Sequence, residues 1–494
     1  MQTWSLVSIC VLLGVVVRWG VSLNSYSAGK PPMFGDYEAQ RHWQEVTYNL
    51  PLQEYFNTTD NDLNYWGLDY PPLTAYHSWI CAYAKIINPD WVELHKSRGY
   101  ESPTHKLFMR TTLLIYIPAV VLYCLYLTDG SSKKKISTLL CFLLYPGLIL
   151  IDYGHFIRYN GVSLGFALWG ILALGLGWDV SGSMAFSLAL NYKQMELYHA
   201  LPFFCYLLGK CIKAGPMGRL FLLVRIAATV LATFALCWLP FLSDPSQALQ
   251  VVRRIFPVAR GLFEDKVANT WCSLNTLIKI RSILSGDSQL YLLACTFLAV
   301  LPASFRLLTK PTFWHFKLAL VNSSLAFFLF SYQVHEKSIL LAAPVCLLLN
   351  DLPLIAIWFL QASTFMLPLF LKDGLLVPYV VTSLAFLFFS LYLLSALDHC
   401  SEDELRMGAY NKLLFFLPKM DLAHVVRWKF YISVAVMAVL SIVSIALVPP
   451  PHLPDLFPVL VSTTAFLHFF GTFVYFNVVQ FSEPPSRKSQ KKNN

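Results

Sequence analysis

The sequence predicts an all-α polytopic membrane protein with about fourteen transmembrane helices. Of its 494 residues, 56% are hydrophobic and only 13% are charged, and the mean hydropathy is +0.54. Water-soluble globular domains contain about 25% charged residues, so a soluble protein of this length is excluded. Apolar runs recur along the whole chain, and most are long enough to cross the roughly 30 Å hydrocarbon layer as a helix.

The first element is a membrane span at residues 4–21. No basic residue precedes this apolar run, and Arg18-Trp19 stands in place of a small-residue cleavage site. These two features argue against a cleaved signal peptide, so we expect a retained anchor.

Residues 22–106 follow as a long polar and aromatic segment outside the bilayer. Within it, the stretch from Pro71 to Asn88 is apolar enough to be another span. A crossing there would place Lys133-Lys134-Lys135 on the opposite side from the other basic loops. We therefore predict amphipathic helices that lie on the membrane surface in this segment.

The remaining chain alternates between groups of spans and loops. We expect spans two to seven in residues 107–240, an outer loop in 241–288, spans eight to fourteen in 289–477, and a tail in 478–494. No tandem repeat or separable soluble domain is visible, so residues 1–494 form a single membrane domain.

Two of the apolar runs, 182–190 and 337–351, are short. A free-standing span needs about 17 to 25 residues, so these runs are expected to be broken or partly re-entrant helices. The 11 cysteines lie mostly inside apolar runs and form no zinc-binding or disulfide pattern.

The net charge of +9 comes from Lys and Arg residues scattered over loops between spans, not from a basic stripe. Membrane lipids are therefore expected partners and nucleic acid is not. Basic loops mark the cytosolic side, and the basic clusters fall on alternate loops of the fourteen-span arrangement. These clusters, which include the C-terminal tail, are 133–135, 210–219, 306–317, 398–428 and 487–492.

Asp36 is the candidate general base. It lies about a dozen positions beyond the first span, on the non-cytosolic side, where a carboxylate could take a proton from a substrate hydroxyl. An alternative is that Asp36 and Glu38 are solvated loop acids or cap the next helix. The Asp36-x-Glu38 pair also matches a pattern that holds Mg²⁺ or Mn²⁺, although two acids at this spacing are weak support for a metal.

His335 and Lys337 are candidates for binding a phosphate. They lie at the junction of two apolar spans, where ionisable residues usually face a cavity lined by protein. Either side chain could stabilise a phosphate leaving group as negative charge develops on it. The alternative is an ordinary polar turn between two helices.

The loop from Phe256 to Trp271 mixes aromatic rings with cations, among them Arg260. Aromatic faces stack on sugar rings, and Arg offers two parallel donors to a phosphate, so Arg260 and Trp271 are candidate substrate ligands. An aromatic belt at the membrane interface would explain the same composition. For the segment from Asn191 to His199, the sequence is equally consistent with a functional role and with a structural one.

Three further residues belong to the polar motifs on this side. Asp69 lies in Gly67-Leu68-Asp69-Tyr70-Pro71-Pro72, and His155 lies in Asp152-Tyr153-Gly154-His155-Phe156. Asn57-Thr58-Thr59 is a glycosylation sequon in the loop that we place outside the cytosol.

Four motifs carry a resemblance to a known family: Phe34 to Trp43, Tyr65 to Tyr76, Asn191 to Pro202, and Gln333 to Ile339. In these motifs, and essentially from end to end, the chain closely resembles the dolichyl-phosphate-glucose glucosyltransferases of the endoplasmic reticulum. Within that family it looks most like the enzyme that adds the first α-1,3-linked glucose to the lipid-linked high-mannose oligosaccharide.

This resemblance implies a GT-C-type fold in the endoplasmic-reticulum membrane, with the site on lumenal loops and the C-terminus in the cytosol. Asp36 matches the family's catalytic acid in the first lumenal loop, residues 22–106. The implied substrates are dolichyl-phosphate-glucose and a dolichyl-pyrophosphate oligosaccharide, with inversion at the anomeric carbon. The leaving group is a lipid monophosphate, so neither a metal nor another cofactor is expected. His155, Glu38 and Asp69 join the substrate ligands, with Glu38 and Asp69 as acceptor ligands or as partners that orient the loop.

Two segments depart from the family's pattern. Ile157-Arg158 stands where relatives have a single Gln, and Arg110 to Ile117 is several residues shorter than its counterpart.

Three alternative functions remain open from the sequence. The paralogous enzyme that adds the second glucose differs in accepting a terminal glucose instead of a mannose. A secondary transporter would also have many spans with broken helices and buried charge, but two related halves are not visible. A non-catalytic subunit of a glycosylation complex is the third alternative.

Overall fold

The computed structural model describes most of the chain, and within that part every regular element is a helix. The all-α class predicted from composition is therefore confirmed. The described residues are 2–24, 29–51, 58–155, 160–256, 266–280, 288–332, 334–349, 351–398, 400–406, 408 and 421–483.

Nine helical segments of the described chain are long and apolar enough to cross a membrane. The expected number of about fourteen spans stays a prediction. The nine segments are Thr3–Ser22, Pro103–Tyr126, Ser132–His155, Pro216–Phe241, Gln289–Thr309, Phe313–Phe330, Leu376–Leu393, Leu422–Ala446 and Leu456–Gln480.

These segments correspond to single helices or to short helices that follow one another directly. They contain α1 (Gln2–Ser22), α4 (Pro103–Thr111), η3 (Thr112–Ile115), α5 (Tyr116–Tyr126), α6 (Ser132–Leu143), α7 (Pro146–Leu148), η4 (Ile149–His155), α11 (Pro216–Trp238), η6 (Leu239–Phe241), α15 (Ser288–Thr309), α16 (Phe313–Phe330), α20 (Leu376–Leu393), α22 (Leu422–Ala446) and α23 (Leu456–Gln480).

Shorter helices fill the bundle between the long ones. The run expected at 182–190 lies inside α9, and the run at 337–351 consists of η7 and α17, which together are shorter than a span. The shorter elements are α8 (Asn160–Gly175), α9 (Asp179–Tyr192), η5 (Gln194–Glu196), α10 (Leu197–Lys213), α13 (Thr270–Ile278), η7 (Glu336–Leu341), α17 (Ala343–Leu347), α18 (Pro353–Ser363) and α19 (Leu367–Lys372).

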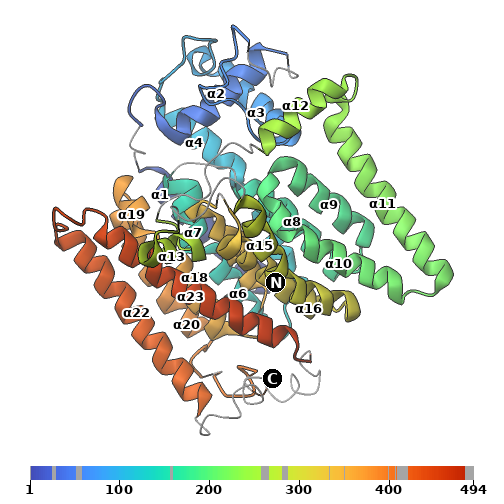
Figure 1. Cartoon of the computed structure of the whole chain (residues 1–494), viewed down its shortest axis with the longest axis vertical. Coiled ribbons are helices and arrows are strands. Elements are labelled where there is room, and N and C mark those ends of the chain that lie inside the picture. Colours follow the sequence, from blue (N-terminus) through green and yellow to red (C-terminus); the bar gives the residue numbers. More distant parts are fainter. Residues whose placement is uncertain are drawn as a thin grey trace.

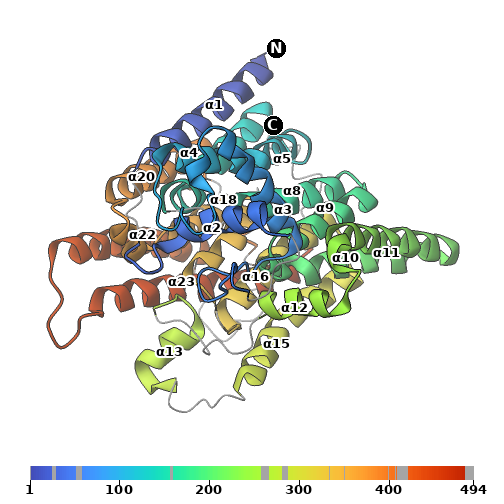
Figure 2. The same cartoon turned by 90° about the horizontal axis from the view of Figure 1, so that it is seen from above.

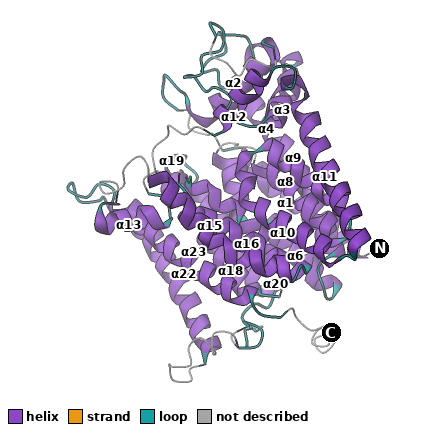
Figure 3. Ribbon diagram, turned by 45° about the vertical axis from the view of Figure 1, so that its right-hand side comes forward, coloured by secondary structure: helices purple, strands orange, loops and turns teal. Residues whose placement is uncertain are grey.

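A second group of helices forms a layer over one end of the bundle, which we call the cap (Figures 1 and 3). Viewed from above, α2 and α3 lie over the middle of the bundle (Figure 2). The cap consists of α2 (Gly35–Asn49), α3 (Pro72–Ala82), η1 (Tyr83–Ile86), η2 (Pro89–Trp91) and α12 (Pro245–Ile255), and α4 begins the candidate span that follows it.

Buried ion pairs fix α2 within the cap. Arg41 has no exposed side-chain surface, and its guanidinium lies 2.6 Å from Glu38 Oε1 and 2.7 Å from Glu45 Oε2. Burial raises the pKa of Glu45, but the hydrogen bond from His42 and the charge of Arg41 outweigh it and lower that pKa to about 2. A buried charge is stable only when paired in this way, so the cluster fixes the rotation of α2.

A single-turn 3₁₀ helix occupies the segment that is shorter than in the resembled family. There α4 ends at Thr111, η3 spans Thr112–Ile115, and α5 begins at Tyr116. The other departure, Ile157-Arg158, lies outside the described residues.

Candidate functional site

Asp36 lies in the first turn of α2, where the cap meets the bundle. The helix begins at Gly35, after Phe34 has turned the chain with a left-handed backbone conformation (φ 56°). The helix N-terminus carries a partial positive charge that favours a carboxylate in this turn. The Asp36 side chain is 16% exposed and contacts residues of the bundle.

Lys337 and His155 contact Asp36, and Asp373 contacts His155; we call the four residues together the Asp36 cluster. Lys337 Nζ lies 3.1 Å from Asp36 Oδ2 and 2.5 Å from His155 Nε2. His155 Nε2 lies 3.4 Å from the same Asp36 oxygen, and His155 Nδ1 contacts the carboxylate of Asp373. The exposed side-chain fractions of Lys337, His155 and Asp373 are 13%, 7% and 5%.

Short helical elements bring these residues together. His155 ends η4, a π-helical turn that continues the span beginning at α6. Lys337 lies in the first turn of η7, and Asp373 directly follows α19. Irregular backbone at membrane depth is tolerated where protein surrounds it, and such irregular turns often carry functional side chains.

The contacts assign the hydrogens within the cluster. A carboxylate only accepts hydrogen bonds, so Nδ1 of His155 carries the hydrogen and donates it in a hydrogen bond to Asp373. Nε2 then carries a lone pair, which accepts a hydrogen bond from the Lys337 ammonium group. Lys337 donates to Asp36 as well, so the ammonium group is shared between the imidazole and the carboxylate.

Glu38 lies in a different environment from Asp36. Its carboxylate accepts hydrogen bonds from Arg41 Nη2 at 2.6 Å and from the Tyr65 hydroxyl at 2.7 Å, and the side chain is 1% exposed. Of the two roles expected for Glu38, this position suits the orientation of the loop. It also separates the two acids of the Asp36-x-Glu38 pair, since each has its own cationic partner.

A cavity of about 320 Å³, which we call the aromatic cavity, lies under α2 and includes Asp36 in its wall. Side chains of the cap and of the segment before η7 enclose it. Its lining includes Asp36, Gln40, Trp43, Trp66, Gly67, Asp69, Tyr70, Arg254 and His335.

A second cavity of about 360 Å³, the lysine cavity, lies between α10, α15, α16 and η7. Asp69, Tyr70 and His335 line both cavities, so the two meet at these residues. The polar part of its wall contains Asn160, Lys193, Gln194 and Lys337, and the apolar part contains Leu164, Leu293, Phe327 and Leu341. This combination suits a phosphate attached to a lipid chain.

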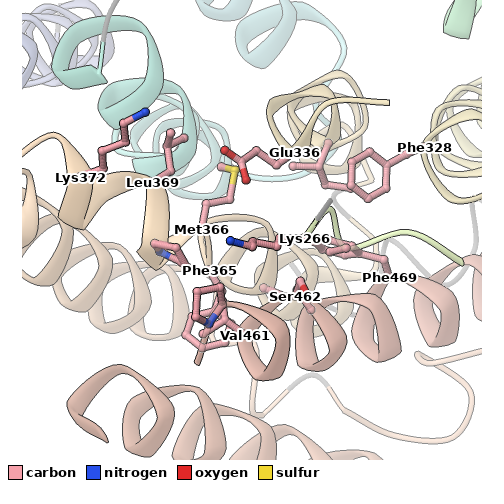
Figure 4. A pocket seen from close by; sticks show the side chains of 16 residues that line it. Lys266, Phe328, Glu336, Phe365, Met366, Leu369, Lys372, Val461, Ser462 and Phe469 are labelled. Atoms are coloured by element: carbon pink, nitrogen blue, oxygen red, sulfur yellow. The ribbon is translucent and has the colours of Figure 1, made fainter. Parts of the chain in front are cut away.

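A third cavity of about 260 Å³ lies on the other side of the His335-Glu336-Lys337 segment, against α18, α19 and α23. Lys266, Glu336 and Lys372 line it together with an apolar wall (Figure 4). Glu336 therefore faces away from the cavity lined by its two neighbours. No residue of the Asp36 cluster lines this third cavity.

Of the residues proposed from the sequence, Asp36, His155 and Lys337 meet in one cluster, and Asp69 and His335 lie at the junction of the two neighbouring cavities. Trp271 lines none of the three cavities, and its indole donates instead to the Phe330 carbonyl at 2.8 Å, at the end of α16.

Arg260 and the sequon at Asn57 lie outside the described residues. Within the described chain, no group of three or more His, Cys, Asp or Glu residues has the arrangement of a metal site.

Three residues of the site were not proposed from the sequence. Asp373 stands in a short turn between two apolar helices and looks there like an ordinary connecting residue. Gln40 follows Asp36 by four positions, which is the spacing of neighbours on one helix face. Arg254 stands between Arg253 and Ile255 in α12, and only the fold brings it opposite α2.

The fold and the site together define a class of protein. An all-helical bundle of candidate membrane spans, with a carboxylate between it and a cap rich in aromatic residues, fits a GT-C-type membrane glycosyltransferase. Residues 9–475 match the ALG6, ALG8 glycosyltransferase family. The chain therefore belongs to this family, and the expectation from the sequence motifs is confirmed.

Relatives match the chain over its whole length. It is 60% identical to the "Dolichyl pyrophosphate Man9GlcNAc2 alpha-1,3-glucosyltransferase" of Gallus gallus and 58% identical to the protein of the same name from Pongo abelii, with all of each chain covered. A Drosophila melanogaster relative, named "Probable dolichyl pyrophosphate Man9GlcNAc2 alpha-1,3-glucosyltransferase", is 46% identical over 95% of this chain and 97% of its own length. The chain is a multi-pass membrane glycosyltransferase of the N-glycan pathway.

Proposed function

We propose that this protein transfers the first glucose, in α-1,3 linkage, to the terminal mannose of a dolichyl-pyrophosphate-linked high-mannose oligosaccharide. The names of the relatives that match the whole chain support this reaction. The observation that carries the chemistry is the Asp36 cluster, which lies next to a sugar-sized cavity and to a cavity with cationic and apolar walls.

In the proposed reaction Asp36 takes the proton of the acceptor mannose 3-hydroxyl. The oxygen attacks the anomeric carbon of the donor glucose from the face opposite the phosphate. The bond between that carbon and the phosphate oxygen breaks, and the lipid phosphate leaves with the bonding electron pair. One displacement with one base inverts the anomeric carbon and needs no covalent sugar intermediate.

The donor that we propose is dolichyl-phosphate-glucose, bound with its phosphate in the lysine cavity. Lys193 and Lys337 supply positive charge there, and the apolar part of the wall suits the lipid chain. His335 borders the same cavity and can donate to the leaving phosphate, which is the electrostatic task that most assists such a step. Arg260, which lies outside the described residues, is proposed as a further phosphate ligand.

We propose that the reaction uses no metal and no other cofactor. The support is that Lys337 already places a positive charge 3.1 Å from Asp36, and that Glu38 is paired with Arg41. Excess EDTA is expected to leave the transfer rate unchanged. A loss of activity that Mg²⁺ or Mn²⁺ restores would contradict this proposal.

We also propose that the protein lies in the endoplasmic-reticulum membrane with the cap in the lumen and the C-terminus in the cytosol. Arg306 lies in the last turn of α15 and Lys310 directly follows that helix, and both contact Glu483, the last described residue. Basic turns favour the cytosolic side. In sealed microsomes, protease should remove a C-terminal tag, and a protected tag would contradict this orientation.

The test of the proposed reaction compares two acceptors with the purified protein. Transfer from dolichyl-phosphate-glucose to an oligosaccharide that ends in mannose is expected, and transfer to one that already ends in glucose is not. Preference for the glucose-terminated acceptor would instead assign the second-glucose reaction.

A further inference from the structure

The aromatic cavity contains a buried hydrogen-bond acceptor without a partner. Asp36, Gln40 and Trp43 follow one face of α2 and line this cavity. Gln40 is 3% exposed, and within the described residues its Oε1 makes no hydrogen bond. Buried polar atoms are nearly always paired, so this oxygen is suited to a hydroxyl donor from a bound molecule.

A guanidinium group enters the same cavity from α12. The Nε atom of Arg254 is buried and, in the described part of the chain, has no hydrogen-bond partner. A Cβ atom on Gly67 would lie 2.5 Å from Nη2 of Arg254 and 2.9 Å from Cδ2 of Leu63, so a side chain at position 67 would displace the guanidinium. Gln40 thus offers an acceptor and Arg254 offers donors.

Aromatic rings form the remaining wall and are fixed by their own contacts. The Trp43 indole donates to the Trp66 carbonyl at 2.9 Å, and the Tyr70 ring meets the Trp43 ring edge-on at 5.1 Å. Rings that are already held in place stack on the apolar faces of a sugar at little entropic cost.

Charge distinguishes this cavity from the lysine cavity. The aromatic cavity has two carboxylates, Asp36 and Asp69, and one guanidinium, so a phosphate is disfavoured there. The lysine cavity has two ammonium groups and only one carboxylate, Asp69. A neutral sugar, whose hydroxyls both donate and accept, fits the aromatic cavity.

We infer that the aromatic cavity binds the terminal mannose of the acceptor, with Arg254 and Gln40 as ligands of its hydroxyls. This inference rests on the proposed function. It separates the two substrates, because the acceptor enters under α2 and α12 while the donor phosphate lies between α10, α15 and η7. The mannose then reaches Asp36 from the aromatic cavity, which Lys337 does not line.

The first test uses Arg254→Gln with Arg253→Gln as its matched control. Arg253 is the exposed neighbour on the same helix and lines neither cavity. Arg254→Gln is expected to raise the KM for the oligosaccharide acceptor about tenfold, the effect of losing one hydrogen bond to a charged group, with the donor KM unchanged. Arg253→Gln should leave both KM values unchanged.

Gly67→Ala provides an independent perturbation, because it moves the guanidinium and leaves its charge intact. It should also raise the acceptor KM, and it should add little in the Arg254→Gln background, where no guanidinium remains to be displaced. An additive effect in that background would show that Gly67 acts on something other than Arg254.

An increase in the donor KM alone, or equal effects of Arg254→Gln and Arg253→Gln, would overturn the inference. If Arg254→Gln gives no turnover, equilibrium binding of a fluorescent lipid-linked oligosaccharide to the folded variant decides the matter. Affinity lowered about tenfold supports the inference, and unchanged affinity contradicts it. If the wild-type protein binds this acceptor and fails to transfer glucose, the proposed function fails while the assignment of the cavity stands.

Discussion

Substitution of Asp373 by Asn should lower the rate of the chemical step without weakening substrate binding. Asp373 accepts a hydrogen bond from Nδ1 of His155. The lone pair on Nε2 is then available to accept a hydrogen bond from Lys337 Nζ, which lies 2.5 Å away. The Asn amide can donate to Nδ1 as well, so the opposite tautomer, with the proton on Nε2, becomes favourable. Two donors would then face each other, and Lys337 would leave its position beside Asp36.

The expected magnitude follows from the burial of this pair. A hydrogen bond to a charged group contributes about 1.5–3 kcal/mol, and about 1.4 kcal/mol corresponds to a tenfold change. We therefore expect kcat to fall by roughly 10-fold to 100-fold. Asp373 lies behind His155 and lines none of the three cavities, so the KM values of donor and acceptor should change little.

The assay is the initial rate of glucose transfer by purified variants, with each substrate varied in turn. Asp351→Asn is the matched control, because Asp351 is also a partly buried carboxylate and accepts a hydrogen bond from the Trp314 indole, outside the cluster. Asp373→Glu keeps the acceptor and should retain more activity than Asp373→Asn.

Coupling to His155 is the decisive part of this experiment. In a His155→Gln background, Asp373→Asn should have little further effect, because its partner is already absent. A wild-type kcat for Asp373→Asn, or an equal loss of rate with and without His155, would refute the reasoning.

Two further predictions concern the stability of the cap. Glu38→Gln should destabilise the protein by about 1.5–3 kcal/mol, seen as a lower thermal midpoint, and leave the acceptor KM unchanged; an increased KM at unchanged stability would instead make Glu38 a substrate ligand. Burial lowers the pKa of His77 to about 4 from its usual 6.5. As the pH falls from 6.5 to 4, the unfolded chain therefore binds a proton at this residue that the folded chain does not bind. The free energy of unfolding decreases over this interval. His77→Asn should lose less stability over this interval, and an unchanged pH dependence would contradict this assignment.

Much of the site was predictable from the sequence because membrane segments make polar residues conspicuous. Charged side chains between apolar runs are costly unless they face a protein-lined cavity, and this rule identified His335 and Lys337. Asp36 was identified by its position just beyond the first span, and His155 by its polar motif and the family resemblance. The alternation of basic loops placed them on one side of the membrane. Their meeting within hydrogen-bonding distance agrees with that reasoning.

The residues that sequence reasoning missed depend on local geometry. Asp36 and Glu38 are two positions apart on a helix, so their side chains point about 200° apart around its axis. They could act as one metal-binding pair only if the segment were not helical. The same helix places Gln40 on the face of Asp36, which follows from the spacing only once α2 is known. Asp373 reaches His155 because η4 ends in a π-helical turn, and no sequence pattern indicated that turn.

The most direct test of the account is glucose transfer by the purified protein from dolichyl-phosphate-glucose to a mannose-terminated lipid-linked oligosaccharide, beside the Asp36→Asn variant. The variant removes the base at nearly constant shape, so the rate should fall by at least about 100-fold while the donor still binds. Normal turnover by Asp36→Asn would show that another group takes the acceptor proton and would contradict the central claim.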